Sequence, residues 1–304
     1  MSHSTSVAIV LVNWNGYEDT AVCLESLKNL DYSNYLVIIV DNGSVDGSEE
    51  KLRKNYPQHT ILQSSANLGF AGGCNLGIRR ALQEHCDYVL LLNNDTRTEP
   101  NLITELVKTA SSNDSIGITS GKVYFEHPPD RIWCYGGSFN VNTGSARHFL
   151  NEQQAAQPLK EPIYLYLPAC LWLLKKECIE SAGFLSEKFF HLAEDVEYCV
   201  RIQQKGWKLA LTPKAVIYHK GSSSMKHLSP VYHYYEQRNR LYIVQEYRLK
   251  NRFFLLQVQD LCVIATRLCL SIFLAQSLSG FFQNAVFITR ALCDFFSGRM
   301  GRRF

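Results

Sequence analysis

The stretch VAIVLV at residues 7–12 and the stretch YLVIIV at residues 35–40 decide the fold of this 304-residue chain. Both are continuous runs of apolar, mostly β-branched residues, the pattern of strands that are buried on both faces of a parallel sheet. A third run, YVLLL, lies at residues 88–92. Helical patterns occur between and after these runs, at 21–30, 48–56, 71–85 and 101–110. The alternation predicts an α/β fold with an open, doubly wound, mostly parallel sheet, whose ligands bind at the carboxyl ends of the strands.

The second half of the chain has a looser pattern. Glycines and a polar stretch at 151–162 indicate an exposed loop within residues 116–167. Further elements are then expected: strands at 165–174 and 215–219, and helices at 176–182 and 194–205. The composition changes near residue 225. We therefore expect a catalytic domain at 1–225 and a helical extension at 226–304.

Charge is distributed unevenly between these two parts. The whole chain is 46% hydrophobic and 19% charged, which excludes a disordered protein, and its net charge of +3 gives no support for a nucleic-acid partner. Residues 1–225 carry 20 basic and 24 acidic residues, whereas residues 226–304 carry 11 basic and 4 acidic ones. Because the extension is both cationic and apolar, we expect it to contact an anionic membrane surface.

Residues 268–289 contain no charged side chain over 22 positions, which is enough for a membrane span of roughly 20 residues. Gln276, Ser279, Gln283 and Arg290 recur on one helical face, however, and this spacing favours a helix that lies in the membrane interface. A packed helix of a water-soluble domain and a true span remain the alternatives.

The cysteines and the N-terminus indicate a cellular compartment. Ten cysteines occur without a CxxC pair, and several of them, such as Cys262 and Cys269, lie in apolar runs. They are typical of small buried hydrophobic residues in a reducing environment. Residues 1–6 are polar and do not resemble a secretory signal peptide. We therefore predict a cytoplasmic protein that is peripheral at the inner face of the cell membrane.

Polar segments directly after the predicted strands are candidates for a binding site. NWNG at 13–16 and DNGSVDGS at 41–48 follow the first two strands, and Asp41 could accept hydrogen bonds from a nucleobase or a ribose. Small residues within NLGFAGGCN at 67–75 permit close approach of a phosphate to a helix N-terminus. Each segment also has an ordinary explanation as a turn or a helix cap.

The fourth segment, Asn93, Asn94 and Asp95, ends the strand at 88–92. Three oxygen-bearing side chains at a strand end suit a hard divalent ion that keeps waters and bridges to a diphosphate. An isolated turn would have the same residues.

Together with downstream segments, these residues resemble the family 2 glycosyltransferases of the GT-A fold, in their rhamnosyltransferase-like branch. Asn93–Asp95 stand at the place of the family's DxD motif, and EDVEYCVR at 194–201 resembles its ED motif. IYHKGS at 217–222 and YYEQRNR at 234–240 resemble the end of that branch. Two departures are present. The DxD place lacks its first carboxylate, which leaves Asp95 as the expected metal ligand, and Ala169–Cys170 replace a more usual Gly and Ala.

The resemblance implies a metal-dependent, inverting transfer of a sugar from a nucleoside diphosphate sugar to an acceptor hydroxyl. Asp195 is the implied base, and Glu194 is implied to hold local structure or an acceptor hydroxyl. Asp95, with His219 as a possible second ligand, is implied to bind Mg²⁺ or Mn²⁺. The expected donor-binding residues are Asn13, Asn15, Asp41, Asn67, Phe70, Asn75, Asn94 and Arg238.

The best donor by this resemblance is dTDP-rhamnose, and the expected acceptor is a glycan or a lipid-linked intermediate of cell-surface polysaccharide synthesis. A UDP- or GDP-sugar donor is the first alternative, and a non-catalytic glycan-binding or scaffold protein is the second. A nucleotidyltransferase would need a glycine-rich, lysine-bearing loop after the first strand, and a dehydrogenase would need GxGxxG there. Residues 13–16 provide neither.

Overall fold

The computed structural model describes residues 5–221, 229–248 and 278–304 of the chain. The first part alternates strands and helices, with bounds β1 (Val7–Asn13), α1 (Tyr17–Leu27), β2 (Tyr35–Asp41), α2 (Ser48–Asn55), β3 (Thr60–Gln63), α3 (Gly69–Gln83), β4 (Tyr88–Asn93), β5 (Thr96–Thr98) and α4 (Leu102–Ala110). The predicted strands and helices of this part are therefore present, and α1 begins four residues before its expected start.

The second part contains more strands than its sequence suggests. Its elements are β6 (Ile116–Phe125), β7 (Ile132–Cys134), β8 (Gly137–Asn140), β9 (Ala146–His148), α5 (Glu152–Ala155), β10 (Ile163–Tyr166), β11 (Leu171–Lys175), α6 (Lys176–Ala182), α7 (Glu194–Gln204) and β12 (Lys208–His219). The prediction of a single strand at 165–174 is wrong. Tyr166 belongs to a small three-stranded sheet, and Leu171 to the large sheet. Pro168, which has no N–H for a ladder, lies in the crossing between them.

The large sheet has nine strands, eight of them in the order β3-β2-β1-β4-β11-β6-β12-β5, with β7 paired to β6. Strands β3, β2, β1 and β4 are mutually parallel, β11 is antiparallel to both of its neighbours, and β12 is parallel to β6. The sheet is therefore mixed. The register places Asn13 beside Asp41, so the ends of β1 and β2 coincide.

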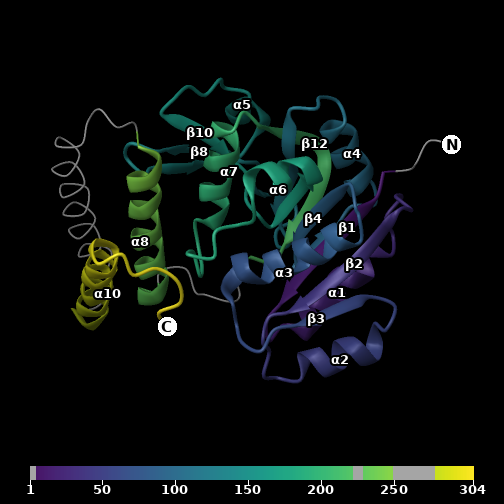
Figure 1. Cartoon of the computed structure of the whole chain (residues 1–304), viewed down its shortest axis with the longest axis horizontal. Coiled ribbons are helices and arrows are strands. Elements are labelled where there is room, and N and C mark those ends of the chain that lie inside the picture. The colour runs from purple at the N-terminus through teal and green to yellow at the C-terminus, as the bar shows by residue number, and fades with distance from the viewer. Residues whose placement is uncertain (1–4, 222–228, 249–277) are drawn as a thin grey trace.

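Helices cover both faces of this sheet (Figure 1). One hydrophobic cluster joins Val10 and Leu91 to side chains of α3, α6 and α7. Another joins the alternate residues Ile9 and Leu90 to side chains of α1, α2 and α4. Because successive strand residues point to opposite faces, this division explains why the strands are apolar without interruption.

The C-terminal part contributes α8 (Pro230–Tyr247) and α10 (Leu278–Phe296), which pack side by side (Figure 1). Ser229 caps α8 by accepting a hydrogen bond from the Tyr232 N–H at 3.1 Å. Ile243 of α8 belongs to the main hydrophobic cluster, so this helix is part of the packed body of the protein.

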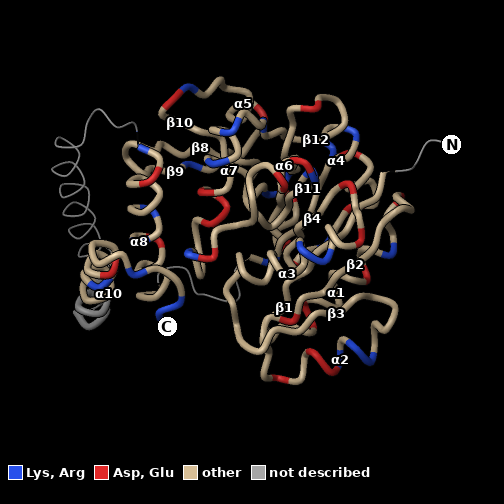
Figure 2. The backbone as a smooth tube through the Cα atoms, viewed as in Figure 1, with Lys and Arg blue, Asp and Glu red and all other residues tan. Residues whose placement is uncertain are grey.

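Several expectations about the extension lie outside the described residues. These are the boundary near residue 225, Ser222, Cys262, Cys269, Gln276 and the first ten residues of the stretch 268–289. Within the described helices, none combines the length and the apolar character that a membrane crossing requires. Figure 2 shows basic residues on the segment after α10, and Phe296 is 76% exposed. Contact with an anionic membrane stays a prediction.

Candidate active site

The ends of β1 and β2 carry a buried hydrogen-bond network. Asn13 Nδ2 donates to Asp41 Oδ2 at 2.9 Å and to Ser44 Oγ at 3.1 Å, and the Ser44 N–H donates to Asp41 Oδ1 at 3.0 Å. Asn13 and Asp41 are both fully buried. Asn15 fixes the same loop, because its Oδ1 accepts from the Val45 N–H at 2.9 Å. The Asp41 carboxylate thus shapes the loop that follows β2.

A hollow of about 370 Å³ opens beside this loop. Its lining residues come from the ends of β2 and β3: Gly43, Ser44, Val45, Gln63, Ser64 and Ser65. The carboxyl ends of neighbouring parallel strands are where an open α/β sheet binds its ligand.

The start of α3 is fitted closely against a loop from the second half of the chain. Gly69 has φ +77°, and a Cβ atom there would lie 2.2 Å from the carbonyl oxygen of Phe190. The Phe70 N–H donates to this same oxygen at 3.2 Å. Asn67 Oδ1 accepts from the Gly69 N–H at 2.8 Å and holds the turn. The segment expected to approach a phosphate therefore also positions the loop around residue 190.

The side-chain amide of Asn75 in α3 is hydrogen bonded to a neighbouring loop. Its amide donates to the carbonyl oxygen of Leu185 at 2.9 Å and to Glu187 Oε1 at 2.9 Å. Its Oδ1 accepts from the Leu185 N–H at 3.0 Å. Both N–H groups of the Asn75 amide are hydrogen bonded within the protein. The expectation that Asn75 binds the nucleoside diphosphate sugar is therefore not supported.

Asp95 and His219 meet at the edge where β4 ends. Asp95 Oδ1 lies 3.0 Å from His219 Nε2, and Asn93 Nδ2 lies 3.3 Å from the same nitrogen. The antiparallel pairing of β12 with β5, which sets His219 opposite Thr96, brings the two side chains together. Burial raises the pKa of Asp95, but the hydrogen bond to His219 and attraction to its charge outweigh this and hold that pKa below its usual value.

This pair has the chemistry of a partial site for a divalent ion. A carboxylate oxygen and an imidazole nitrogen 3.0 Å apart could both bind one ion at bond lengths of roughly 2.1 Å. His219 Nδ1 and Asn93 Oδ1 are buried without a hydrogen-bond partner among the described residues. The described ranges hold no group of three or more His, Cys, Asp or Glu that could bind a metal.

Glu194 and Asp195 begin α7 after a strained turn. Leu192 and Ala193 both have φ +67°, a conformation that costs L-residues energy and is found at functional sites. Glu194 is buried and its Oε2 has no partner among the described residues, whereas Asp195 is half-buried.

Both carboxyls of this pair have raised pKa values. Burial is the main cause for each, and for Glu194 the neighbouring charge of Asp195 adds to it. Hydrogen bonds to the backbone of Val196 and Ala169 oppose the shift at Asp195, which leaves its pKa at about 6. A carboxylate of this kind is a stronger base than an ordinary aspartate and is still ionised at neutral pH.

Three of the predicted site carboxylates lie around one region. Hydrogen bonds run from Asp41 through Asn13 and Thr20 to Asn94, which precedes Asp95, with distances of 2.9 Å at each step. The Asn93 N–H donates to the Cys170 carbonyl at 3.1 Å, and the Asp195 carboxylate accepts a hydrogen bond from the backbone of Ala169, so the end of β4 and the start of α7 both contact the segment 169–170.

A row of rings extends from His219, the partner of Asp95, to Tyr166. The centroid of Trp133 lies 5.1 Å from that of His219 and 5.7 Å from that of His148, and His148 lies 5.9 Å from Tyr166. Burial raises the pKa of Tyr166, and the charge of Asp195 contributes. Sequence reasoning missed these three aromatic residues, because they come from β7, β9 and β10, which are too short to show a pattern.

Arg238 is held within the C-terminal part. It is 1% exposed, donates to the Tyr234 hydroxyl at 3.2 Å and to the Gly301 carbonyl at 3.0 Å, and stacks on the rings of Tyr234 and Tyr235. Its other donors go to Asn239 Oδ1. The expectation that Arg238 contacts the diphosphate is therefore not supported, because its guanidinium is committed to protein groups.

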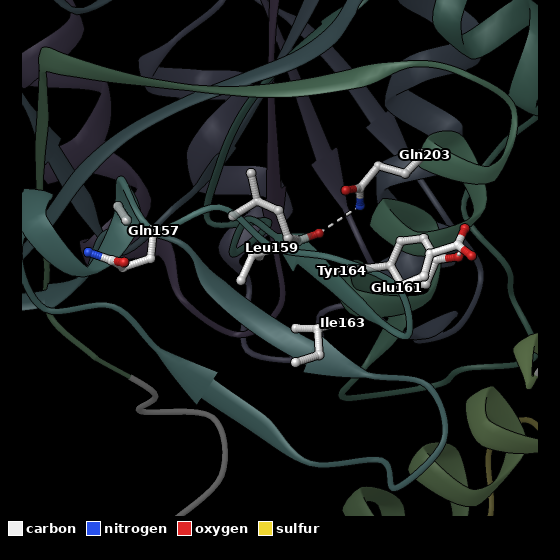
Figure 3. A pocket seen from close by; sticks show the side chains of 8 residues that line it. Gln157, Leu159, Glu161, Ile163, Tyr164 and Gln203 are labelled. Atoms are coloured by element: carbon white, nitrogen blue, oxygen red, sulfur yellow. Dashed lines mark hydrogen bonds between the residues drawn. The ribbon is translucent and has the colours of Figure 1, made fainter.

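A second hollow, of about 310 Å³, lies beside β10 and the last turn of α7 (Figure 3). Gln203 donates to the Leu165 carbonyl at 2.7 Å at its wall. Gln203 is near the C-terminal end of α7, whereas Glu194 and Asp195 are at its N-terminal end. This hollow is thus separate from the region of the carboxylates.

Comparisons with known proteins show which family the sequence matches. Residues 8–180 match the profile of the family described as Glycosyl transferase family 2. An N-acetylglucosaminyl-diphospho-decaprenol L-rhamnosyltransferase of Mycobacterium tuberculosis is 26% identical over 212 residues, which cover 62% of this chain and 67% of that protein. The dTDP-rhamnosyl transferase RfbF of Shigella flexneri is 24% identical over 250 residues, 77% of this chain and 81% of RfbF.

Solved structures share the fold at lower identity. GalNAc-T7 with UDP, GalNAc and Mn²⁺ has a TM-score of 0.63 and 16% identity, over 82% of this chain and 50% of that one. The mannosyltransferase PcManGT of Pyrobaculum calidifontis, in complex with GDP-Man and Mn²⁺, has a TM-score of 0.57 and 14% identity, over 98% of this chain and 89% of that one. These likenesses confirm an α/β architecture of the GT-A type.

Proposed function

The chain belongs to glycosyl transferase family 2, and from this membership we propose that it moves one sugar, with inversion, from a nucleoside diphosphate sugar to an acceptor hydroxyl. Asp195 is the base of this reaction. The observation that carries the proposal is that the strand end before Asp95 and the carboxylate of Asp195 contact neighbouring residues, Cys170 and Ala169, although Asp95 and Asp195 are 100 positions apart in sequence.

The half-buried carboxylate of Asp195 performs the proton transfer. It accepts the proton of the acceptor hydroxyl while that oxygen forms a bond to the anomeric carbon. The bond between this carbon and the diphosphate oxygen breaks, and its electron pair leaves with the diphosphate. A single displacement inverts the anomeric configuration. The raised pKa of Asp195 improves proton acceptance, because general bases work best with a pKa near the working pH.

The hydrogen-bond network at the ends of β1 and β2 forms the binding site for the nucleotide part of the donor. The loop that Asp41, Asn13 and Asn15 hold borders the hollow after β2 and β3, which suits a base and ribose. Asp95 and His219 would hold Mg²⁺ or Mn²⁺. When bound, the ion supplies positive charge that stabilises the leaving diphosphate.

We propose dTDP-rhamnose as the donor, with UDP- and GDP-sugars as alternatives. Support comes from the names of the Mycobacterium tuberculosis and Shigella flexneri relatives, both rhamnosyltransferases at about a quarter identity. The first relative is named after N-acetylglucosaminyl-diphospho-decaprenol, a lipid-linked sugar diphosphate. This name supports a lipid-linked acceptor here as well.

The test measures nucleoside diphosphate release by the purified full-length chain with dTDP-rhamnose, UDP-sugars and GDP-sugars in Mn²⁺. An N-acetylglucosaminyl diphosphate lipid is added or omitted as acceptor. We expect acceptor-stimulated release with dTDP-rhamnose. Asp195→Asn should lower kcat by about 100- to 10,000-fold while donor binding by calorimetry is kept.

Asp114→Asn is the matched control, because that side chain is fully exposed and paired only with Lys175. No release with any donor would favour the non-catalytic scaffold. An unchanged kcat for Asp195→Asn would remove Asp195 as the base.

A further inference from the structure

Asn239 of α8 contacts the strained turn that carries the Glu194–Asp195 pair. Its Nδ2 donates to the carbonyl oxygens of His191 and Leu192, both at 2.8 Å. Asn239 is fully buried. These two carbonyls belong to the residues directly before Ala193, which precedes the first turn of α7.

The orientation of this amide is fixed from its other side. Asn239 Oδ1 accepts from Arg238 Nε at 3.0 Å and from Arg238 Nη2 at 2.9 Å. A flipped amide would place N–H donors against the guanidinium and an oxygen against two carbonyl oxygens. The neighbouring residues therefore leave one satisfactory orientation, with both donors directed at the turn.

Arg238 in turn is anchored to the end of the chain. It donates to the Gly301 carbonyl at 3.0 Å, and the Gly301 N–H donates to the Lys188 carbonyl at 2.8 Å. The loop 188–193 is thus held at its start by Gly301 and near its end by Asn239. On its other side, the Phe190 carbonyl accepts from the Phe70 N–H at the start of α3.

We propose that Asn239 is a positioning residue, which holds the turn at Leu192 and Ala193 in its left-handed conformation and thereby places the Asp195 carboxylate. The proposal rests on the function proposed above, in which Asp195 is the base. The physical reason is that neither Leu192 nor Ala193 favours a positive φ by itself. Two hydrogen bonds to the adjacent carbonyls supply the constraint, and displacement of a reacting group by about 1 Å can lower a rate by roughly 100-fold.

The experiment compares four variants of the full-length protein in the release assay. Asn239→Ala should lower kcat by about 10- to 100-fold, while the KM for the donor changes by less than about threefold. Asn239→Asp keeps the partner of Arg238 but removes the donors, so it should show the same loss in kcat and serves if Asn239→Ala does not fold. Gln245→Ala, exposed on the same helix, is the control and should keep wild-type kcat.

The fourth variant combines Asn239→Ala with Ala193→Gly. Glycine adopts a positive φ without strain, so this variant should recover kcat by at least about threefold over Asn239→Ala alone. A purely structural role for Asn239 would predict a further loss, because glycine adds flexibility to the turn.

The outcomes separate this inference from the proposed function. The positioning role would be overturned if Asn239→Asp kept a kcat within twofold of wild type while Asp195→Asn was inactive in the same assay. A further loss of kcat in the double variant would overturn it as well. Full activity of Asp195→Asn would instead overturn the assigned base, whatever the Asn239 variants do.

Discussion

The loops after β1 and β2 and the turn before α7, which the proposed function assigns to one site, differ in their physical state. Around Asn13 and Asp41, polar side chains are buried and joined to one another by hydrogen bonds. Around Glu194, a buried carboxyl oxygen lacks a partner among the described residues, and two residues with positive φ precede it. The proposed nucleotide side is relaxed and preorganised, whereas the turn that carries the proposed base has two residues at positive φ and carboxyls with raised pKa values.

The proposed function gives a reason for this difference. A binding loop gains from satisfied hydrogen bonds, because these fix its shape before the ligand arrives. A general base must be removed in part from water to raise its pKa, and this removal costs stability. We therefore predict that substitutions in the loops after β1 and β2 lower stability more than activity. Substitutions of the carboxyls at the start of α7 should lower activity more than stability.

Beyond the Asp195→Asn test, the largest expected effect is on Asp95 and His219, the proposed ligands of the metal ion. Asp95→Ala should lower kcat by about 100- to 1,000-fold and abolish stimulation by Mn²⁺, because charge stabilisation of the leaving group is lost. His219→Ala should raise the Mn²⁺ concentration for half-maximal activity by about 10- to 100-fold. Metal titrations of the release assay measure both, with Asp114→Asn as the control. If Mn²⁺ stimulated Asp95→Ala as strongly as the wild type, Asp95 would not be a ligand of the ion. The proposed metal site between the nucleotide loops and the base would then be wrong.

A smaller effect is expected where the two sides touch, at Gly69. Gly69→Ala should lower the free energy of unfolding by about 3 kcal/mol, since a methyl group would meet the Phe190 carbonyl and φ is positive. Gly47→Ala, also at positive φ but with no atom within 4 Å, should cost only about 1 kcal/mol. Urea unfolding of both variants gives the difference. Equal losses would show that the contact between α3 and the loop around residue 190 contributes nothing.

The smallest effect should be a gain, from Glu194→Gln. The folded protein holds the proton of Glu194 more tightly than the unfolded chain, with a pKa of about 8 against 4.5, so wild-type stability falls as pH rises through this interval. Glutamine lacks this cost. The variant should be more stable by about 1 kcal/mol at pH 8, a rise in Tm of roughly 2–4 °C, and should show no advantage below pH 4.5. A lower Tm than wild type at pH 8 would show that the ionised Glu194 has a partner when folded.

Sequence patterns found the first part of the fold because each strand there is apolar over its whole length. β1, β2 and β4 lie within one residue of their expected bounds, and Asp41 does end β2. In the second part, β7, β8 and β9 have three or four residues each, too few for a periodic pattern. The strand expected at 165–174 crosses between two sheets, which an apolar run by itself does not indicate.

The same division holds for the candidate site. Short motifs located Asp95 and Asp195 beside the ends of locally encoded elements, just after β4 and in the first turn of α7, and their roles stay predictions. Arg238 and Asn75 looked equally suited to binding, but burial and hydrogen bonds direct them into the protein. Asn239 offered no signal of its own beyond its place in a motif.

By itself, the sequence determined which segments become buried parallel strands, which polar residues follow them and where the carboxylates lie along the chain. These features depend on side chains close together in sequence. Only the tertiary structure decided that His219 meets Asp95, that rings from three short strands pack in a row beside His219, and that Asn239 of α8 donates to the Leu192 carbonyl. Such contacts join residues tens to more than a hundred positions apart, and packing of the sheets and helices selects them, which no local pattern records.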